Sequence, residues 1–116
     1  MRVTATLVAT LVALTAFPVS ATGSSVTGNE FIKDCNSDEP MRKTFCYGYV
    51  AGMLDGMAVG RVGISPLFCL PANVTVGQVT DMTLKALREQ PQTRHLPMRV
   101  TLAVEVIRAF PCKQGG

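Results

Sequence analysis

Residues 39–59 read EPMRKTFCYGYVAGMLDGMAV, and apolar side chains recur in this stretch every three or four residues. That interval is the period of one face of an α-helix. Pro40 is compatible with a helix because it would lie in the first turn, and Asp38 or Ser37 can cap the start. The stretch therefore predicts a long helix over 39–59 with one face in a protein core. The core face would consist of Cys46, Val50, Met53, Leu54 and Met57.

Beside this face the same helix carries glycines spaced four residues apart, at Gly48, Gly52, Gly56 and Gly60. Each glycine inside a helix costs ~1 kcal/mol relative to alanine, so we expect a close contact to offset that cost. The contact that we expect is another helix of the same domain, and the alternative is a seam between two copies of the chain. Glycine rows also associate inside membranes, but Arg42, Lys43 and Asp55 argue against a membrane span here.

Three further helices are predicted outward from this one, over residues 28–35, 76–90 and 97–110. Thr27 with Glu30 and Thr75 with Gln78 have the spacing of capping boxes. Asn73-Val74-Thr75 also matches a glycosylation acceptor, but we favour the capping role for Thr75. The expected core side of the last helix consists of Leu102, Ala103, Val106, Ile107 and Phe110. The sequence thus predicts an all-α fold, a small bundle of about four helices.

The amino-terminal segment has the features of an export signal. Arg2 precedes an uncharged, mostly apolar run, and Val19-Ser20-Ala21 ends in a residue suited to signal peptidase. A membrane anchor is the alternative, but the run is shorter than the ~20 apolar residues of a spanning helix and stops at Pro18. We therefore expect residues 1–21 to be a signal peptide cleaved after Ala21. Residues 22–27 would be a short tail and 28–116 one domain.

Charge and composition exclude some functions. Cleavage removes one positive charge, Arg2, so the formal net charge falls from +3 to +2. This balance is too mild to indicate nucleic acid or an anionic membrane as a partner. The mature chain is expected to have no membrane span.

The four cysteines, Cys35, Cys46, Cys69 and Cys112, all lie in the mature part. An even number in a short exported chain indicates disulfides, and four cysteines allow three pairings. We expect Cys35 to pair with Cys46 and Cys69 with Cys112. A zinc site is the alternative, but it needs closely spaced ligand pairs, and the sequence has none and a single histidine.

The sequence offers little for catalysis. A nucleophile–histidine arrangement could use only His95, for which capping the end of the third helix is the simpler role. Asp55 lies nearly opposite the core face of the long helix, where solvent exposure is expected. We find no phosphate loop and no metal-ligand cluster. The sequence therefore predicts a binding or structural protein, without a cofactor or bound metal, rather than an enzyme.

Several motifs occur in a fixed order along the chain. They are C-Y-G-Y-x-A-G at 46–52, F-C-L-P at 68–71, Val74-Thr75 with Gln78, Leu87-Arg88 before Gln90-Pro91, His95-Leu96-Pro97, and F-P-C at 110–112. As an ordered set they resemble the Rap/Tai family of immunity proteins associated with type VI secretion. The resemblance covers residues 28 to 112, nearly the whole mature chain.

The resemblance implies a periplasmic, disulfide-bonded helical protein that is often a homodimer. Members of that family bind and block peptidoglycan amidase effectors, which are cysteine-histidine peptidases, by plugging the active-site cleft. The implied partner is therefore a cognate amidase.

Contacts to a partner are expected on exposed loops and polar helix faces. The candidate contact residues are Asp81, Lys85, Arg88, Gln92, Arg94 and His95. An alternative function that suits small size, helices and a disulfide brace is that of a small periplasmic chaperone or stress protein.

Overall fold

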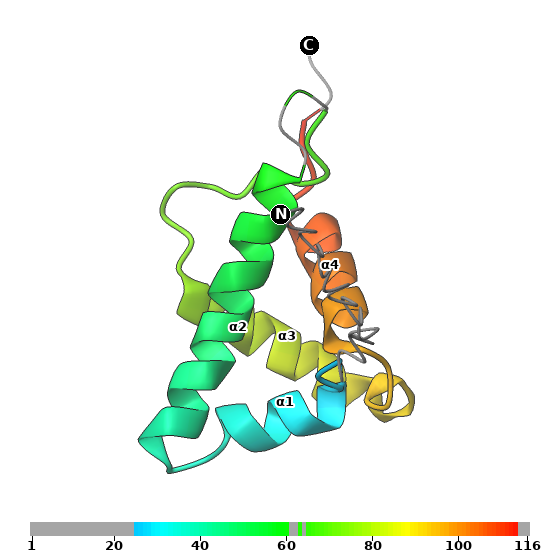
Figure 1. Ribbon diagram of the computed structural model, residues 1–116. Coiled ribbons are helices and arrows are strands. Elements are labelled where there is room, and N and C mark those ends of the chain that lie inside the picture. Colours follow the sequence, from blue (N-terminus) through cyan, green and yellow to red (C-terminus); the bar gives the residue numbers. More distant parts are fainter. Residues whose placement is uncertain (1–24, 61–62, 64, 114–116) are drawn as a thin grey trace, which may run out of the picture.

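The computed structural model describes residues 25–60, 63 and 65–113, and Figure 1 shows the arrangement of their helices. In these residues there are four α-helices and one short 3-10 helix: α1 (Gly28–Cys35), α2 (Pro40–Val59), α3 (Val76–Glu89), η1 (Pro91–Thr93) and α4 (Met98–Ala109). The described part contains no strand, only an isolated bridge between Thr27 and Pro97. The all-α prediction is confirmed, and helix ends differ from the expected ones by one residue at most. The predicted signal peptide lies outside the described residues.

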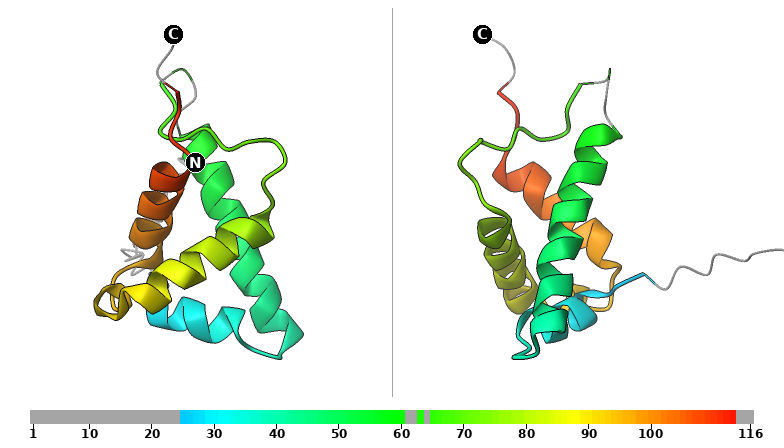
Figure 2. Two further views of the ribbon diagram at one scale, coloured as in Figure 1. Left: turned by 180° about the vertical axis from the view of Figure 1, so that it is seen from behind. Right: turned by 60° about the vertical axis from the view of Figure 1, so that its left-hand side comes forward.

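The helices cross one another and enclose the core between them. The long α2 lies in front of α3 in Figure 1, and the view from behind in Figure 2 shows α3 crossing in front of α2, above α1. Every α-helix contributes to the core, whose fully buried side chains include Phe31, Val50, Val79, Leu87, Met98, Leu102 and Val106. None of the helices described is long and apolar enough to cross a membrane.

The expected disulfides are both formed. Cys35–Cys46 joins the end of α1 to the second turn of α2, and Cys69–Cys112 joins the central loop to the segment after α4. The main-chain N–H of Cys69 also donates to the carbonyl of Phe110 at 2.8 Å.

The start of α1 is the capping box that the sequence predicts. The Thr27 N–H donates to Glu30 Oε2 at 2.8 Å, and the Glu30 N–H donates to Thr27 Oγ1 at 3.3 Å. The bond from the Thr27 backbone lowers the pKa of the exposed Glu30 carboxyl. Because the folded pKa is lowered, the stabilisation from this box is present above the unfolded pKa and is lost as pH falls through the folded one.

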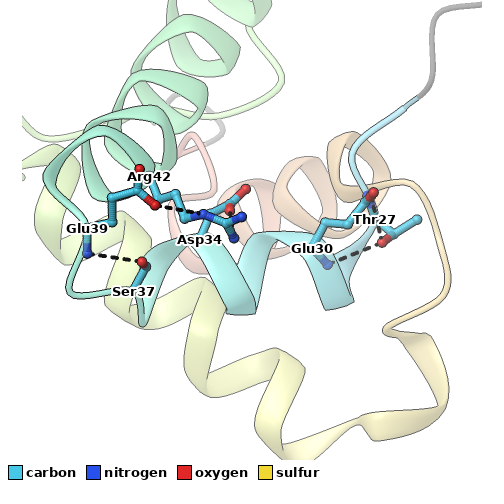
Figure 3. A network of polar contacts seen from close by, with 6 residues as sticks. All are labelled: Thr27, Glu30, Asp34, Ser37, Glu39 and Arg42. Atoms are coloured by element: carbon cyan, nitrogen blue, oxygen red, sulfur yellow. Dashed lines mark hydrogen bonds and ion pairs between the residues drawn. The ribbon is translucent and has the colours of Figure 1, made fainter.

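The predicted cap of α2 is wrong in its detail. The N-cap is Glu39, whose side chain makes no capping bond, while Ser37 Oγ accepts from the Glu39 N–H at 3.1 Å. Arg42 lies 3.3 Å from Asp34 and 3.2 Å from Glu39, which ties this corner to α1 (Figure 3). Exposed ion pairs of this kind contribute at most about 1 kcal/mol, so the disulfide contributes more to this corner than the ion pairs do.

The start of α3 confirms the second predicted capping box, between Thr75 and Gln78. Two threonines, Thr80 and Thr83, are buried among its apolar residues. Their hydroxyls donate to the carbonyls of Val76 and Val79, four residues earlier, at 2.8 and 2.7 Å. Because these bonds satisfy the hydroxyls, threonine can occupy the core at little cost.

The expected helix beside the glycine row is absent from the described part. A Cβ atom placed on Gly48, Gly52 or Gly56 would have no neighbour within 4 Å. The row lies on the outside of α2 because Gly48 and Gly52 are each two residues from the buried Val50, on nearly the opposite side of the helix. Three interior glycines therefore cost the isolated chain about 1 kcal/mol each with no compensating contact inside it.

The glycine that does need close packing is Gly28. A Cβ there would lie 2.8 Å from Leu87 Cδ2 and 3.0 Å from both Cα and the carbonyl oxygen of Arg94. The adjacent N–H groups use the same approach: Gly28 donates to the Leu96 carbonyl at 3.2 Å and Asn29 to the Arg94 carbonyl at 2.9 Å. The first turn of α1 is thus fastened to the turn that precedes α4.

Gly28→Ala is expected to lower the free energy of unfolding by about 1–3 kcal/mol, because the new methyl group meets main-chain atoms that cannot move aside cheaply. Gly77→Ala is the matched control in the first turn of α3, where the nearest atom is 3.7 Å away, an ordinary contact. Urea unfolding of both variants measures the difference. Equal stabilities for the two variants would contradict the close contact at Gly28.

Candidate functional site

The residues considered for catalysis, His95 and Asp55, lie on different elements of the fold. His95 is exposed in the turn before α4 and Asp55 is exposed on α2. All four cysteines are in disulfides, so none supplies a thiolate. Across residues 25–60, 63 and 65–113, no three His, Cys, Asp or Glu side chains are close enough together to hold a metal ion.

The predicted contact residues lie along one continuous stretch of chain. Asp81, Lys85 and Arg88 are exposed on α3, and Gln92 is exposed in η1. Lys85 Nζ lies 3.9 Å from Glu89 Oε1 on the same helix face. In Figure 1 the η1 turn projects at the corner where α3 and α4 meet.

Arg94 has a structural role that the sequence did not reveal. Its Nε donates to the Leu87 carbonyl at 2.7 Å, and its second terminal nitrogen donates to the Arg88 carbonyl at 3.2 Å. These carbonyls lie in the last turn of α3, where no helical N–H remains to bond them. Arg94 therefore caps the end of α3, the role that the sequence analysis assigned to His95.

The η1 turn comprises residues 91–97, between α3 and α4. Hydrogen bonds to the chain around the start of α1 hold it in place. The carbonyls of Arg94 and Leu96 accept from the start of α1, and the Met98 N–H donates to the Val26 carbonyl at 2.6 Å. The Thr93 hydroxyl donates to the Gln90 carbonyl at 2.8 Å. Gln92 and His95 are left exposed on a turn whose backbone is fixed. A fixed turn loses little conformational freedom when it binds a partner.

A small groove lies between this turn and α4. It has a volume of ≈ 120 Å³ and is lined by Gln90, Thr93, Leu96, Val100, Thr101, Val104, Glu105 and Arg108. Val100 is 47% exposed and Val104 is 43% exposed. At the edge of the groove Arg108 lies 3.5 Å from Glu105. Apolar side chains bordered by arginine and other polar groups are the usual composition of a protein interface.

The sequence analysis missed this groove because it assigned a single core side to α4. Leu102 and Val106 are buried as expected, but Ile107 is 36% exposed, so its predicted core position is wrong. Ile107 lies on an outer face with Val100 and Val104, which are spaced four residues apart. The signal in the sequence was that α4 has apolar residues all around its axis, which indicates a second contact.

Comparison with protein families gives a match over most of the chain. The model of the family described as Rap1a immunity proteins matches residues 27–112. No curated protein and no solved structure matches the chain significantly.

Proposed function

The chain belongs to the Rap1a immunity protein family, and from this membership we propose that it protects its own cell by binding and inhibiting a type VI secretion effector. The observation that carries the proposal is the extent of the match, which runs from the N-cap of α1 to the last cysteine. The effector that we propose is a peptidoglycan amidase with a cysteine-histidine site. The immunity protein performs no reaction and acts by occupying the cleft of the amidase.

We propose the periplasm as the place of action. The paired cysteines suit an oxidising compartment, and the expected signal peptide over 1–21 would deliver the chain there. The peptidoglycan substrate of an amidase lies in the same compartment. The proposed assembly is a homodimer.

The surface proposed for the effector is the η1 turn with the groove beside it. Gln92 and His95 project from a turn that is braced on its other side, which suits entry into a cleft without rearrangement. Val100 and Val104 supply exposed apolar area next to the turn. Asp81, Lys85 and Arg88 on α3 would form a charged rim, where contacts contribute to orientation more than to affinity.

Val104→Glu is expected to weaken binding of a cognate amidase effector at least ~10-fold, because it puts a charge into the apolar centre of the proposed interface. His95→Ala should weaken binding as well. The measurement is calorimetric titration together with hydrolysis of peptidoglycan by the amidase. Val59→Glu is the matched control, since Val59 is an exposed valine on α2 that is absent from this groove.

Two results would count against the proposal. Absence of binding between the unaltered protein and any neighbouring or related amidase would overturn the function. Full inhibition by Val104→Glu and His95→Ala together with loss of inhibition by Val59→Glu would overturn the surface.

A further inference from the structure

The two disulfides differ in how closely a reagent in solution can approach them. Cys46 is 1% exposed and belongs to the core cluster, and Cys35 is half-buried against that cluster. In the other bond Cys112 is half-buried and Cys69 is exposed. A thiolate that cleaves a disulfide has to reach one of its sulfur atoms, and of the four cysteines Cys69 alone is exposed.

We propose that Cys69–Cys112 is a redox-sensitive bond, which a dithiol reductant opens by attack on Cys69, and that its opening releases the central loop while the helices stay folded. The central loop is defined here as residues 65–75, the described segment that leads into α3. The argument rests on access to the sulfur atoms, on the group that leaves, and on how the loop is held.

The exchange has two steps. A thiolate of the dithiol attacks Cys69 Sγ, the bond between the two cysteines breaks, and Cys112 leaves as a thiolate. The second thiolate of the dithiol then attacks the mixed disulfide, and Cys69 leaves in turn. The protein gains two electrons, its two thiolates take up the two protons that the dithiol gave up, and the dithiol becomes a disulfide.

The group that leaves also favours this bond over the other one. Cys112 is followed directly by the exposed Lys113, and a positive charge nearby stabilises a thiolate. Attack on Cys35 would instead release the Cys46 thiolate into the apolar core, where an unpaired charge is costly. Attack on Cys46 itself is blocked by burial. Cys69–Cys112 is therefore the bond that a reductant opens first.

The central loop has few other attachments. It contains no helix or strand, and none of its residues is fully buried. Phe68, Leu70 and Val74 are half-buried against the core, and the Cys69 N–H donates to the carbonyl of Phe110. Segments with little buried surface and no regular structure open at a low cost in free energy.

A hollow between the central loop and the last turns of α2 limits the packing of the loop further. Its volume is ≈ 290 Å³, and its lining is apolar: Met57, Ala58, Pro66, Leu67, Phe68 and Leu70. Side chains that face each other across a hollow lose the contacts that direct packing would give them. Once the disulfide is cut, we expect the loop to move away from α2 and to expose Phe68 and Leu70.

The bond lies at the opposite end of α4 from the η1 turn. In Figure 1 the segment after α4 runs beside the loop that follows α2, at the top of the view, and the η1 turn is at the lower corner. The 12 residues of α4 separate the two regions by about 18 Å along the helix axis. The loop can therefore open while the turn keeps its position. What changes is the resistance of the chain to proteases, which couples the persistence of the protein to the thiol redox state around it.

The first test is timed reduction of the purified protein by dithiothreitol, with free thiols alkylated and located by peptide mass spectrometry. We expect the Cys69–Cys112 pair to be labelled at least ~10-fold faster than the Cys35–Cys46 pair. In denaturing urea the difference should disappear, because both bonds are then in solvent. Equal rates for the folded protein, or faster labelling of the Cys35–Cys46 pair, would overturn the inference.

The attacked sulfur is identified with glutathione, which has a single thiol and cannot complete the second step by itself. At early times it should be trapped as a mixed disulfide on Cys69, the exposed partner. Glutathione found mainly on Cys112 would contradict the proposed direction of attack.

Release of the loop is measured by limited digestion with chymotrypsin. Reduction of this bond should speed cleavage after Leu67 or Phe68 at least ~10-fold, with the helical circular dichroism signal unchanged. The double variant Cys69→Ser, Cys112→Ser should show the same cleavage without a reductant. The matched control is the double variant Cys35→Ser, Cys46→Ser, which should gain no cleavage at these two sites.

Two results would contradict the release of the loop. One is an unchanged cleavage rate in protein whose Cys69 and Cys112 are fully alkylated, and the other is loss of the helical signal on reduction. Inhibition of an amidase separates this test from that of the proposed function. Fast cleavage with inhibition retained supports both proposals, and fast cleavage in a protein that inhibits no amidase overturns only the function.

Discussion

Replacing both Cys69 and Cys112 with serine is expected to lower the free energy of unfolding by about 4 kcal/mol. This disulfide closes a loop with a sequence separation of 43, and a longer loop removes more conformational entropy from the unfolded chain. The double substitution avoids leaving one reactive thiol. Urea denaturation of the oxidised protein measures the loss.

The matched control is the double replacement of Cys35 and Cys46 with serine. The disulfide between these two cysteines closes a loop with a separation of only 11. Its expected cost is smaller, about 3 kcal/mol. If the variant without Cys69–Cys112 unfolds at the same urea concentration as the unaltered protein, the brace between the central loop and the end of α4 contributes nothing to stability.

Phe31→Ala is expected to lower the free energy of unfolding by about 3–5 kcal/mol. Phe31 is fully buried, and its ring centroid lies 6.1 Å from that of Tyr49 on α2. Because α1 has only eight residues, one large buried side chain provides much of its contact with the core. Removing it leaves a cavity that short α1 cannot close.

Phe45→Ala is the control for this substitution, since it removes the same side chain from a half-exposed position on α2. Measured on dilute monomer, it should cost far less than Phe31→Ala. Equal losses would mean that the two rings contribute alike and would contradict the placement of Phe31 at the centre of the core.

The helices, the two capping boxes and the Cys35–Cys46 disulfide could be predicted because their signals are local in the sequence, and Cys69–Cys112 follows as the remaining pair. Thr27 and Glu30 are three residues apart, and the box forms wherever the chain enters a helix. Cys35 and Cys46 are separated by a short turn between two predicted helices, which leaves little choice of partner. Such features depend on neighbouring residues and need no knowledge of tertiary packing.

The contacts of Gly28 and Arg94 could not be predicted because they join segments far apart in the chain. Nothing near Gly28 in the sequence indicates that the main chain of Arg94 lies against it. The choice of Arg94 rather than His95 as the cap of α3 depends on how the turn folds back onto Leu87. The groove beside α4 was missed for the same reason, since Val100 and Val104 resemble core residues until the helix is placed.

The glycine row illustrates a different limit. Its spacing correctly indicated a helix face without bulky side chains, but the expectation of a neighbour within the domain was wrong. The sequence shows that one helix face lacks bulky side chains. It does not show whether the surface that covers this face belongs to the same chain. The structure leaves the face open within the described residues.

The disulfide pattern also bears on how the chain matures. Each bond joins cysteines that are consecutive in the sequence, Cys35 with Cys46 and Cys69 with Cys112. When a chain enters an oxidising compartment with its amino terminus first, the two members of each pair arrive one after the other. Oxidation in order of arrival then gives the native bonds directly. Pairs formed in this order do not have to be broken and exchanged, a step that takes seconds to hours.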